Sequence, residues 1–288
     1  MINGHTEVLG LIGNPVAHTM SPCIHNTIAK QMRIEAAYLP FPVEKDIDTA
    51  VKGAYALGIK GMNITVPYKS AVIPFLKEID HEAETIGAVN TLVKVSSGYK
   101  GYNTDMPGLY RALKREGIQI EDAGVIIIGA GGAARAAAFM SAFKGAKNIC
   151  MLNRTKEKAM EVVAEVICKT GYQNIAAYGI DEYDKVPGDG YLVLQATKAG
   201  LSPNVEDSPI TDSAFFAKAA VVYDLIYNPQ QTRFMKLAGE QGVKAYHGLT
   251  MLLYQGIQAF ELWYDISLPD DVIEMVYTAL KKECGINE

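Results

Sequence analysis

A glycine-rich stretch, residues 125–134, carries the residue types needed to hold a dinucleotide. It begins with Val-Ile-Ile-Ile, an apolar run that predicts a strand buried on both faces. Gly129 and Gly131 then allow a tight turn and a close approach of the backbone to a ligand, and Ala134 takes the third small position. The alanine-rich segment 133–143 predicts a helix whose N-terminal N–H groups and positive dipole end would face a pyrophosphate.

The end of the next predicted strand indicates which dinucleotide binds. A strand over 148–152 follows about twenty residues after the glycines, as the dinucleotide-binding pattern requires. NAD-binding proteins commonly carry Asp or Glu at its end, whereas this chain has Asn153-Arg-Thr155. The Arg154 guanidinium is suited to a 2′-phosphate, and Lys158 adds a charge one helical turn later. The sequence therefore favours NADP over NAD.

A second group of reactive side chains precedes the glycine turn. The predicted strand 61–66 contains Asn63 and Thr65 and delivers Lys69 to its C-terminal edge, where ligands bind in α/β sheets. A lysine can transfer a proton there, but a solvated surface lysine is the alternative interpretation. Asp105 stands just before a predicted helix over 106–116, where it could be no more than a helix cap.

Two hydroxyl residues lie near the start of a further predicted helix, which runs from Ser21-Pro22 to Met32. The hydroxyls of Thr19 and Ser21 together with the helix dipole are suited to holding a carboxylate. Capping of the helix by Ser21 alone is the competing interpretation.

Composition excludes several classes of function. A net charge of -5 provides no basic surface for nucleic acid, and no apolar run reaches the ~18 residues that a membrane span needs. The N-terminus lacks the basic and apolar regions of a signal peptide, so we expect a cytoplasmic protein. The four cysteines are far apart, which fits reduced thiols, and His18 and His25 lack the neighbours of a metal site.

The pattern of elements predicts an α/β protein of two domains, since 288 residues are enough for two separate cores. Residues 1–105 plus 248–288 are expected to form an N-terminal α/β substrate domain. Residues 106–247 are expected to form a Rossmann-type, doubly wound dinucleotide-binding domain. Two predicted helices, 249–263 and 271–282, have no strand between them and are expected to return to the first domain. Short helices are predicted over 71–76 and 83–86, and a strand is predicted to start at Gly87.

From residue 9 to about residue 263 the chain resembles the shikimate dehydrogenase family. The resemblance is specific because several motifs occur in the family's order. They are Gly13-Asn-Pro-Val-Ala-His-Thr-Met-Ser-Pro22 with His25-Asn26, Gly61-Met-Asn-Ile-Thr-Val-Pro-Tyr-Lys69, Gly87-Ala-Val-Asn-Thr91, Gly101-Tyr-Asn-Thr-Asp105, Asn153-Arg-Thr155, and Gly248-Leu-Thr-Met-Leu252 with Gln255-Gly256.

The resemblance implies a reversible, NADP-linked oxidation of shikimate to 3-dehydroshikimate in aromatic amino-acid biosynthesis. It makes Lys69 and Asp105 the catalytic pair. The expected substrate contacts are Thr19, Ser21, Asn63, Thr65, Asn90, Asp105, Tyr227 and Gln255. The expected cofactor contacts are Gly129, Ala130, Gly131, Gly132, Ala133, Asn153, Arg154, Thr155, Lys158, Leu225 and Gly248. No metal is expected, and the oligomeric state, monomer or homodimer, stays open.

Two departures from the family pattern leave alternatives open. The family usually has Ser where Thr19 stands, which puts the choice between shikimate and quinate in doubt. The family's Asn-Ala-Thr-Ser-x-Gly loop appears as residues 195–200, with Gln195 and Lys198 replacing Asn and Ser. A dual quinate/shikimate dehydrogenase that also accepts NAD, and a non-catalytic NADP-binding regulator, are the competing functions.

Overall fold

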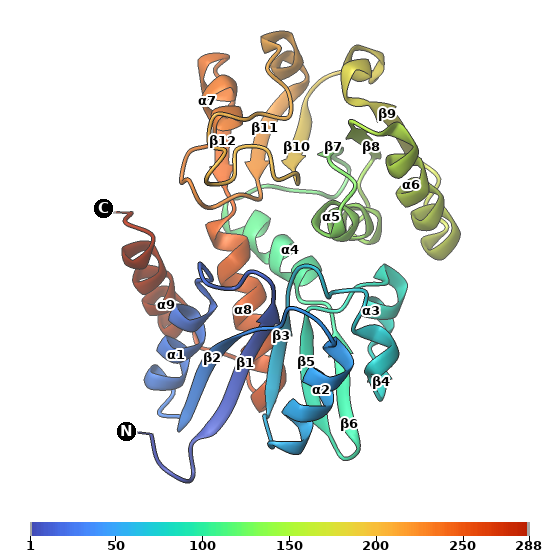
Figure 1. Cartoon of the computed structure of the whole chain (residues 1–288). Helices are drawn as coiled ribbons and strands as arrows, with labels where there is room; N and C mark the ends of the chain where they lie inside the picture. Colours follow the sequence, from blue (N-terminus) through green and yellow to red (C-terminus); the bar gives the residue numbers. More distant parts are fainter. Residues whose placement is uncertain (1, 287–288) are drawn as a thin grey trace. The chain divides into compact units, whose positions relative to one another are not determined.

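The computed structural model of the chain describes residues 2–286, which divide into two compact units (Figure 1). Unit 1 comprises the residues up to Gly108 and those from Leu253 onward, and unit 2 comprises Leu109–Leu252. The chain passes between the units inside two helices, α4 (Asp105–Arg115) and α8 (Leu249–Tyr264). Each unit contains one sheet and is described by itself.

The sheet of unit 1 has six strands in the order β2-β1-β3-β5-β6-β4. Strand β1 pairs in parallel with β2 and β3, whereas β5 runs antiparallel to both β3 and β6. The strands are β1 (Glu7–Gly13), β2 (Ala36–Pro42), β3 (Gly61–Ile64), β4 (Glu78–Ile79), β5 (Thr91–Val95) and β6 (Gly98–Tyr102). Mixed strand directions bring the ends of β3 and β6 and the start of β5 to one edge.

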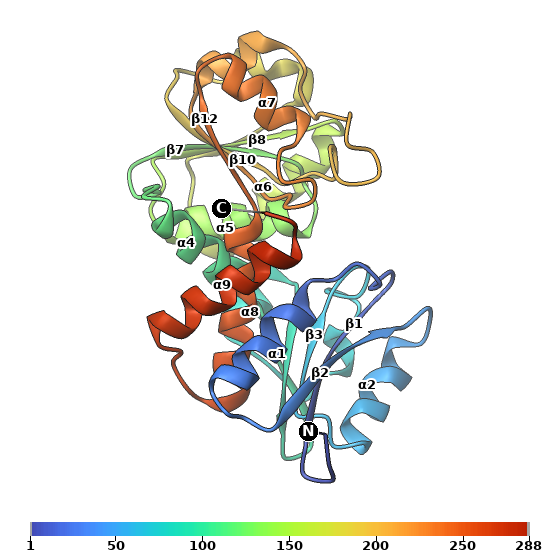
Figure 2. The ribbon, with the colours of Figure 1, turned by 90° about the vertical axis from the view of Figure 1, so that its left-hand side faces the viewer.

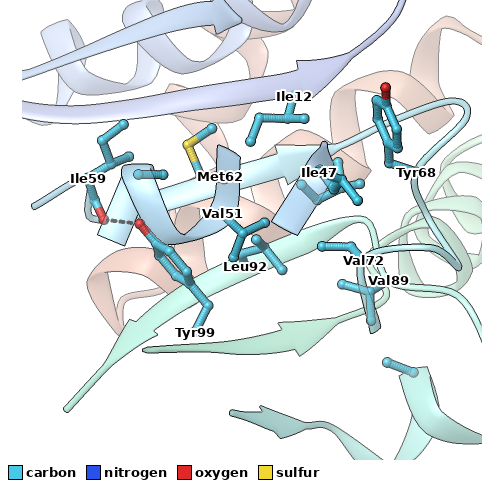
Figure 3. Close-up of a cluster of buried hydrophobic side chains, with 13 residues drawn as sticks. Ile12, Ile47, Val51, Ile59, Met62, Tyr68, Val72, Val89, Leu92 and Tyr99 are labelled. Carbon is cyan, nitrogen blue, oxygen red and sulfur yellow. Dashed lines mark hydrogen bonds between the residues drawn. The ribbon is translucent and has the colours of Figure 1, made fainter. Parts of the chain in front are cut away.

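Helices pack against this sheet. The helices of unit 1 are α1 (Ser21–Gln31), α2 (Ile47–Ala56), α3 (His81–Ile86) and α9 (Asp270–Glu283), with parts of α4 and α8. Helix α9 lies along α1 (Figure 2), so the C-terminal helices join the first unit as the sequence predicts. On the face that α2 covers, Val51 of the helix belongs to the same buried cluster as Met62, Leu92 and Tyr99 of the strands (Figure 3).

The sheet of unit 2 is parallel throughout, in the order β12-β11-β10-β7-β8-β9. Numbered from β7, this is the strand order 3-2-1-4-5-6 of a doubly wound dinucleotide-binding sheet, which confirms the predicted fold class. In such sheets, ligands bind beyond the carboxyl ends of the strands where the order reverses, here between β7 and β10. The strands are β7 (Gly124–Ile128), β8 (Asn148–Asn153), β9 (Ile175–Gly179), β10 (Tyr191–Gln195), β11 (Ala219–Asp224) and β12 (Lys244–His247).

The helices of unit 2 connect these strands. They are α5 (Gly132–Phe143), α6 (Lys156–Thr170) and α7 (Arg233–Glu240), with 3₁₀ turns η2 (Ile180–Lys185) and η3 (Ser213–Lys218). Helix α5 buries Ala134, Ala137 and Ala138 completely, and small side chains at such positions let a helix pack closely against its sheet.

Two predicted elements of unit 1 are wrong in extent. The predicted helix over 71–76 is only a 3₁₀ turn, η1 (Ile73–Phe75). The strand predicted from Gly87 begins at Thr91 instead, because α3 ends at Gly87 in the left-handed conformation, with φ +70°. The three residues between Gly87 and Thr91 form a connection that brings Asn90 to the edge of the sheet.

Candidate active site

The expected catalytic residues come together because their loops leave the same edge of the unit 1 sheet. Asn63 lies in β3 and Lys69 follows that strand, while Asp105 follows β6. Since β5 runs antiparallel to both strands, Asn90 at its start reaches the same edge. Hydrogen bonds hold the loops there: the Val89 N–H donates to the Lys69 carbonyl at 2.8 Å, and the Asn90 N–H donates to the Tyr102 carbonyl at 3.0 Å.

Lys69 and Asp105 form an ion pair across 36 positions of the sequence. The distance from Lys69 Nζ to Asp105 Oδ2 is 2.5 Å, and the two side chains are 26% and 10% exposed. Asn90 Nδ2 donates to the other carboxylate oxygen at 2.9 Å. The interpretation of Lys69 as a solvated surface lysine is therefore wrong, because its ammonium is held against a largely buried carboxylate.

Asp105 does not cap the helix that it begins. The Asn103 side chain accepts from the backbone N–H groups of Asp105 at 3.1 Å and Met106 at 3.2 Å. A neighbouring residue thus satisfies the first turn of α4, and the Asp105 carboxylate is left to hold Lys69 and Asn90. The interpretation of Asp105 as a cap is wrong for this reason.

Further hydrogen bonds fix the orientation of the Asn90 carboxamide. Its Oδ1 accepts from the Thr104 N–H at 2.7 Å and from the Thr104 hydroxyl at 3.2 Å, so its Nδ2 must face Asp105. Thr91 and Asn103 belong to the same network, and both are buried. Sequence reasoning missed these supporting residues, although the polar pairs at 90–91 and 103–104 beside predicted strands were a visible signal.

The two hydroxyls at the start of α1 are adjacent. Helix α1 begins at Ser21, and its N-cap residue, Met20, makes no side-chain capping hydrogen bond. The capping interpretation of Ser21 is therefore wrong. The Thr19 hydroxyl instead donates to Ser21 Oγ at 3.1 Å, and the Ser21 N–H donates to Thr19 Oγ1 at 3.2 Å. Two hydroxyls at the positive end of a helix dipole suit a carboxylate.

The structure shows fewer contacts for the remaining residues that are expected to bind substrate. Thr65 is half-buried directly after β3, where its N–H donates to the Ile12 carbonyl at 2.9 Å. Gln255 lies where α8 touches α4, since a Cβ on Gly108 would stand 2.7 Å from the Gln255 backbone nitrogen. Tyr227 follows β11 in unit 2 and is half-buried. Its position relative to Lys69 stays a prediction.

In unit 2, the glycine turn leaves β7 with a backbone that only glycine adopts readily. Gly129 has φ +118°, and a Cβ there would lie 3.2 Å from the Ala196 carbonyl oxygen at the start of the loop after β10. A Cβ on Gly131 or Gly132, at the N-terminus of α5, would meet nothing within 4 Å. This open cradle at a helix N-terminus fits a pyrophosphate, with Ala130 and Ala133 beside it.

The end of β8 carries exposed cations. Asn153 Nδ2 donates to the Thr155 carbonyl at 2.7 Å, which shapes the turn, and the side chains of Arg154 and Lys158 are exposed. Residues 153–155 include no carboxylate, so nothing at the strand end repels a 2′-phosphate. These groups fit NADP.

Leu225 and Gly248, also expected at the cofactor, are packed against each other. A Cβ on Gly248 would stand 2.1 Å from the Leu225 carbonyl oxygen, so only glycine fits at this position. The Gly248 N–H donates to the Ile226 carbonyl at 2.9 Å. This contact holds the segment after β11 against the start of α8.

The loop that departs from the family pattern is anchored from inside unit 2. Gln195 is fully buried; its Oε1 accepts from the Thr197 N–H at 2.5 Å, and its Nε2 donates to Asp224 Oδ1 at 3.3 Å. Asp224 also accepts from the Thr232 hydroxyl at 2.6 Å. Burial raises the pKa of Asp224 to about 6 despite the hydrogen bond from Thr232. Lys198, in contrast, is exposed.

Within residues 2–286, no group of three or more His, Cys, Asp or Glu side chains is arranged to hold a metal ion. None of the helices in that range is both long enough and apolar enough to cross a bilayer. All four cysteines are free thiols.

Comparisons with known proteins identify the family. Residues 11–92 match the model of the shikimate dehydrogenase substrate binding domain, and residues 111–208 match that of shikimate / quinate 5-dehydrogenase. The shikimate dehydrogenase (NADP(+)) of Desulforamulus reducens is 42% identical over 279 residues, covering 96% of this chain and 96% of that protein. That of Methanothermobacter thermautotrophicus is 40% identical over 278 residues, covering 95% and 96%.

Solved structures indicate the same family. A crystal structure of shikimate dehydrogenase in complex with NADP+ superposes with a TM-score of 0.89 at 38% identity, covering 100% of this chain and 98% of the other. The Thermus thermophilus shikimate 5-dehydrogenase, in complex with NADP(H) and shikimate, gives a TM-score of 0.83 at 30% identity, covering 96% and 100%. The chain belongs to the shikimate dehydrogenase family.

Proposed function

We propose that this protein catalyses the reversible, NADP-dependent oxidation of shikimate to 3-dehydroshikimate, a step in the biosynthesis of chorismate and the aromatic amino acids. Membership of the family supports the reaction. The observation that carries it to this chain is the Lys69–Asp105 pair, with its 2.5 Å contact inside a polar network at the edge of the sheet. A non-catalytic regulator would have no need to keep this pair so tightly organised.

In the proposed mechanism, Lys69 handles the proton. Hydride leaves the carbinol carbon only as the hydroxyl proton is removed. The neutral amine of Lys69 accepts that proton in oxidation and becomes the ammonium, and the ammonium donates the proton to the carbonyl in reduction. Asp105 holds the ammonium in place, and Asn90 holds Asp105. NADP, when bound, supplies the hydride acceptor. Oxidation of one alcohol thus yields one ketone, one reduced cofactor and one proton.

The proposed substrate contacts divide by chemistry. Thr19 and Ser21 bind the carboxylate at the start of α1, where two hydroxyls and the helix dipole meet. Ring hydroxyls need fixed polar partners, because a buried polar group left unpaired costs about 1–3 kcal/mol. The residues proposed for that task are Asn63, Thr65, Asn90, Asp105, Gln255 and, from unit 2, Tyr227.

The proposed cofactor contacts are the glycine turn and the end of β8. Gly131 and Gly132 receive the pyrophosphate at the start of α5, and Arg154 and Lys158 bind the 2′-phosphate. The other proposed contacts are Gly129, Ala130, Ala133, Asn153, Thr155, Leu225 and Gly248. On this basis residues 1–105 plus 248–288 act as the substrate domain, and 106–247 as the NADP domain.

The deciding experiment is an assay of the full chain with shikimate and quinate, each with NADP and with NAD, in which formation of the reduced nicotinamide is followed. We expect the highest kcat/KM for shikimate with NADP. A preference for NAD of about tenfold or more, equivalent to ~1.4 kcal/mol, would contradict the cofactor assignment. Comparable turnover of quinate would instead identify a dual enzyme. Turnover of neither acid would favour the competing function, a non-catalytic NADP-binding regulator.

We also propose a cytoplasmic protein that acts as a monomer or homodimer. Four free thiols fit a reducing compartment. Light scattering of the purified chain measures its oligomeric state.

A further inference from the structure

Tyr38 is a buried polar residue that lies directly behind the expected substrate contacts. It belongs to β2, two strands from Asn63 in β3, and it is 2% exposed. A buried hydroxyl needs a hydrogen-bond partner, and Tyr38 donates to Asn63 Oδ1 at 2.8 Å. Tyr38 is not itself a catalytic residue, because its hydroxyl bonds Asn63 rather than Lys69 or Asp105.

The other atoms of the Asn63 carboxamide are also committed. Its Nδ2 donates to the Asn90 carbonyl at 3.2 Å and to the Thr91 hydroxyl at 3.1 Å, which uses both N–H groups. The oxygen therefore faces Tyr38, and one acceptor position remains on that oxygen. Held in this way, Asn63 meets a ligand as a hydrogen-bond acceptor, and a hydroxyl is the group that it recognises.

Burial raises the pKa of Tyr38 far above its usual range, so its hydroxyl stays protonated and donates the hydrogen bond to Asn63.

We propose that Tyr38 is a positioning residue: its hydroxyl keeps the Asn63 carboxamide turned so that Oδ1 accepts a hydrogen bond from a ring hydroxyl of the substrate. The proposal rests on the proposed function and adds a residue and a direction of hydrogen bonding to it. Without the Tyr38 hydroxyl, Asn63 loses the partner of its oxygen and is free to rotate, so that a substrate hydroxyl meets an amide that is no longer oriented.

The surroundings of Tyr38 make a clean variant possible. Its backbone N–H donates to Asn26 Oδ1 at 2.8 Å, and its carbonyl accepts from Asn26 Nδ2 at 3.2 Å. Its ring stacks on His25, with centroids 4.2 Å apart and an interplanar angle of 24°. Tyr38→Phe keeps the ring and these backbone contacts, so it removes one hydroxyl and little else.

Tyr99 provides a matched control in the same unit. It is 1% exposed, and its hydroxyl donates to the Ile59 carbonyl at 2.7 Å inside the apolar cluster under α2 (Figure 3). Tyr99→Phe also removes one buried hydrogen-bonded hydroxyl, but from a partner outside the expected site. A purely structural role for Tyr38 would make the two variants behave alike.

The kinetic test compares the wild type, Tyr38→Phe and Tyr99→Phe with shikimate and NADP. We expect similar small losses of Tm in both variants. Only Tyr38→Phe is expected to raise the KM for shikimate, by about tenfold, as for one lost hydrogen bond, with an unchanged KM for NADP. In an Asn63→Ala background, Tyr38→Phe should add nothing, because the group through which it acts is gone. Equal kinetics of the two phenylalanine variants, or additive effects in the Asn63→Ala background, would overturn the proposal.

A second measurement does not depend on turnover. The side-chain amide signals of Asn63, assigned in ¹⁵N-labelled full-length protein without substrate, should shift in Tyr38→Phe and stay in place in Tyr99→Phe. Unchanged Asn63 signals in Tyr38→Phe would reject the positioning role whatever the activity. A wild type that oxidises no shikimate would contradict the proposed function, and the amide signals would still decide whether Tyr38 orients Asn63.

Discussion

The two candidate sites of this protein are made from different parts of the polypeptide. In unit 1, the groups that could do chemistry are side chains that hold one another: Lys69 contacts Asp105, and Asn90 contacts Asp105. In unit 2, the groups are mostly backbone N–H groups at the start of α5, together with the exposed cation Arg154. The first site depends on which side chains are present, and the second depends on where side chains are absent.

This difference has a physical cause. A proton-transfer group must be held within hydrogen-bonding distance of its partner, and a buried network of fixed side chains provides that precision. A pyrophosphate presents a spread negative charge, and a helix N-terminus recognises it through N–H groups that every residue carries. Substitutions should therefore damage the two sites in different ways.

The largest effect is expected at Lys69. Replacing Lys69 with Ala should lower kcat by about 10²–10⁴-fold, the usual contribution of a positioned proton-transfer group, while substrate binding weakens far less. Lys60→Ala is the matched control, because Lys60 pairs with Glu7 at 2.9 Å in the same unit but away from this edge. Steady-state kinetics and shikimate titration provide the two numbers. A Lys69→Ala variant with nearly normal kcat would contradict the proton-transfer role of Lys69.

Adding a side chain should damage the second site. Gly131 has φ -83°, which any residue adopts, and a Cβ there meets nothing, so Gly131→Val should fold with nearly normal Tm. Its side chain would occupy the space next to the N-terminal N–H groups of α5. Loss of one hydrogen bond to a charged phosphate costs about 1.5–3 kcal/mol, or roughly 10–150-fold in the Kd for NADP. Calorimetric titration with NADP measures this. A Kd equal to that of the wild type would place the pyrophosphate elsewhere.

A smaller effect is expected at the exposed cation of the same site. Arg154→Ala should raise the KM for NADP by about tenfold, as for one lost charge-assisted hydrogen bond, and leave the KM for NAD unchanged. NAD thus provides the control within one variant, because it lacks the 2′-phosphate. Equal losses with both cofactors would mean that Arg154 supports the turn rather than the phosphate.

The smallest effect is expected for the buried carboxyl of Asp224, which contacts Gln195 and Thr232 in unit 2. Burial raises the pKa of Asp224 to about 6, so folding favours the protonated carboxyl. Its contribution to the free energy of unfolding is therefore lost as pH rises through about 6, by about 1 kcal/mol from pH 5 to pH 7. Urea unfolding at both pH values should show this fall in the wild type and not in Asp224→Asn.

Asp212 is a control of opposite sign. The hydrogen bond from Tyr183 lowers the pKa of the exposed Asp212 carboxyl, so its contribution to stability is lost as pH falls instead. In Asp212→Asn, the part of the change in the free energy of unfolding between pH 5 and pH 7 that arises from Asp224 should be unaltered. An unchanged pH dependence in Asp224→Asn would mean that this carboxyl is not the source.

Elements set by local sequence were predicted well. The strand β7, the turn and α5 follow one another without interruption, so the glycines, the small residues and the alanine-rich helix identify the unit without knowledge of the rest of the chain. The extent of weaker elements was predicted less well. Residues 71–76 include Pro74, which lacks a backbone N–H and is tolerated only in the first turn of a helix, so only the 3₁₀ turn η1 forms.

By itself, the sequence determined that a dinucleotide site follows β7, that its second strand ends in Asn153-Arg-Thr155, and, through its ordered motifs, which family the chain resembles. Only the tertiary structure decided that Lys69 and Asp105 hold each other, that Asn103 rather than Asp105 satisfies the start of α4, and that Tyr38 faces Asn63. The reason is sequence separation. A turn and a helix are encoded within a few residues, whereas a contact between Lys69 and Asp105 depends on the pairing of β3, β5 and β6.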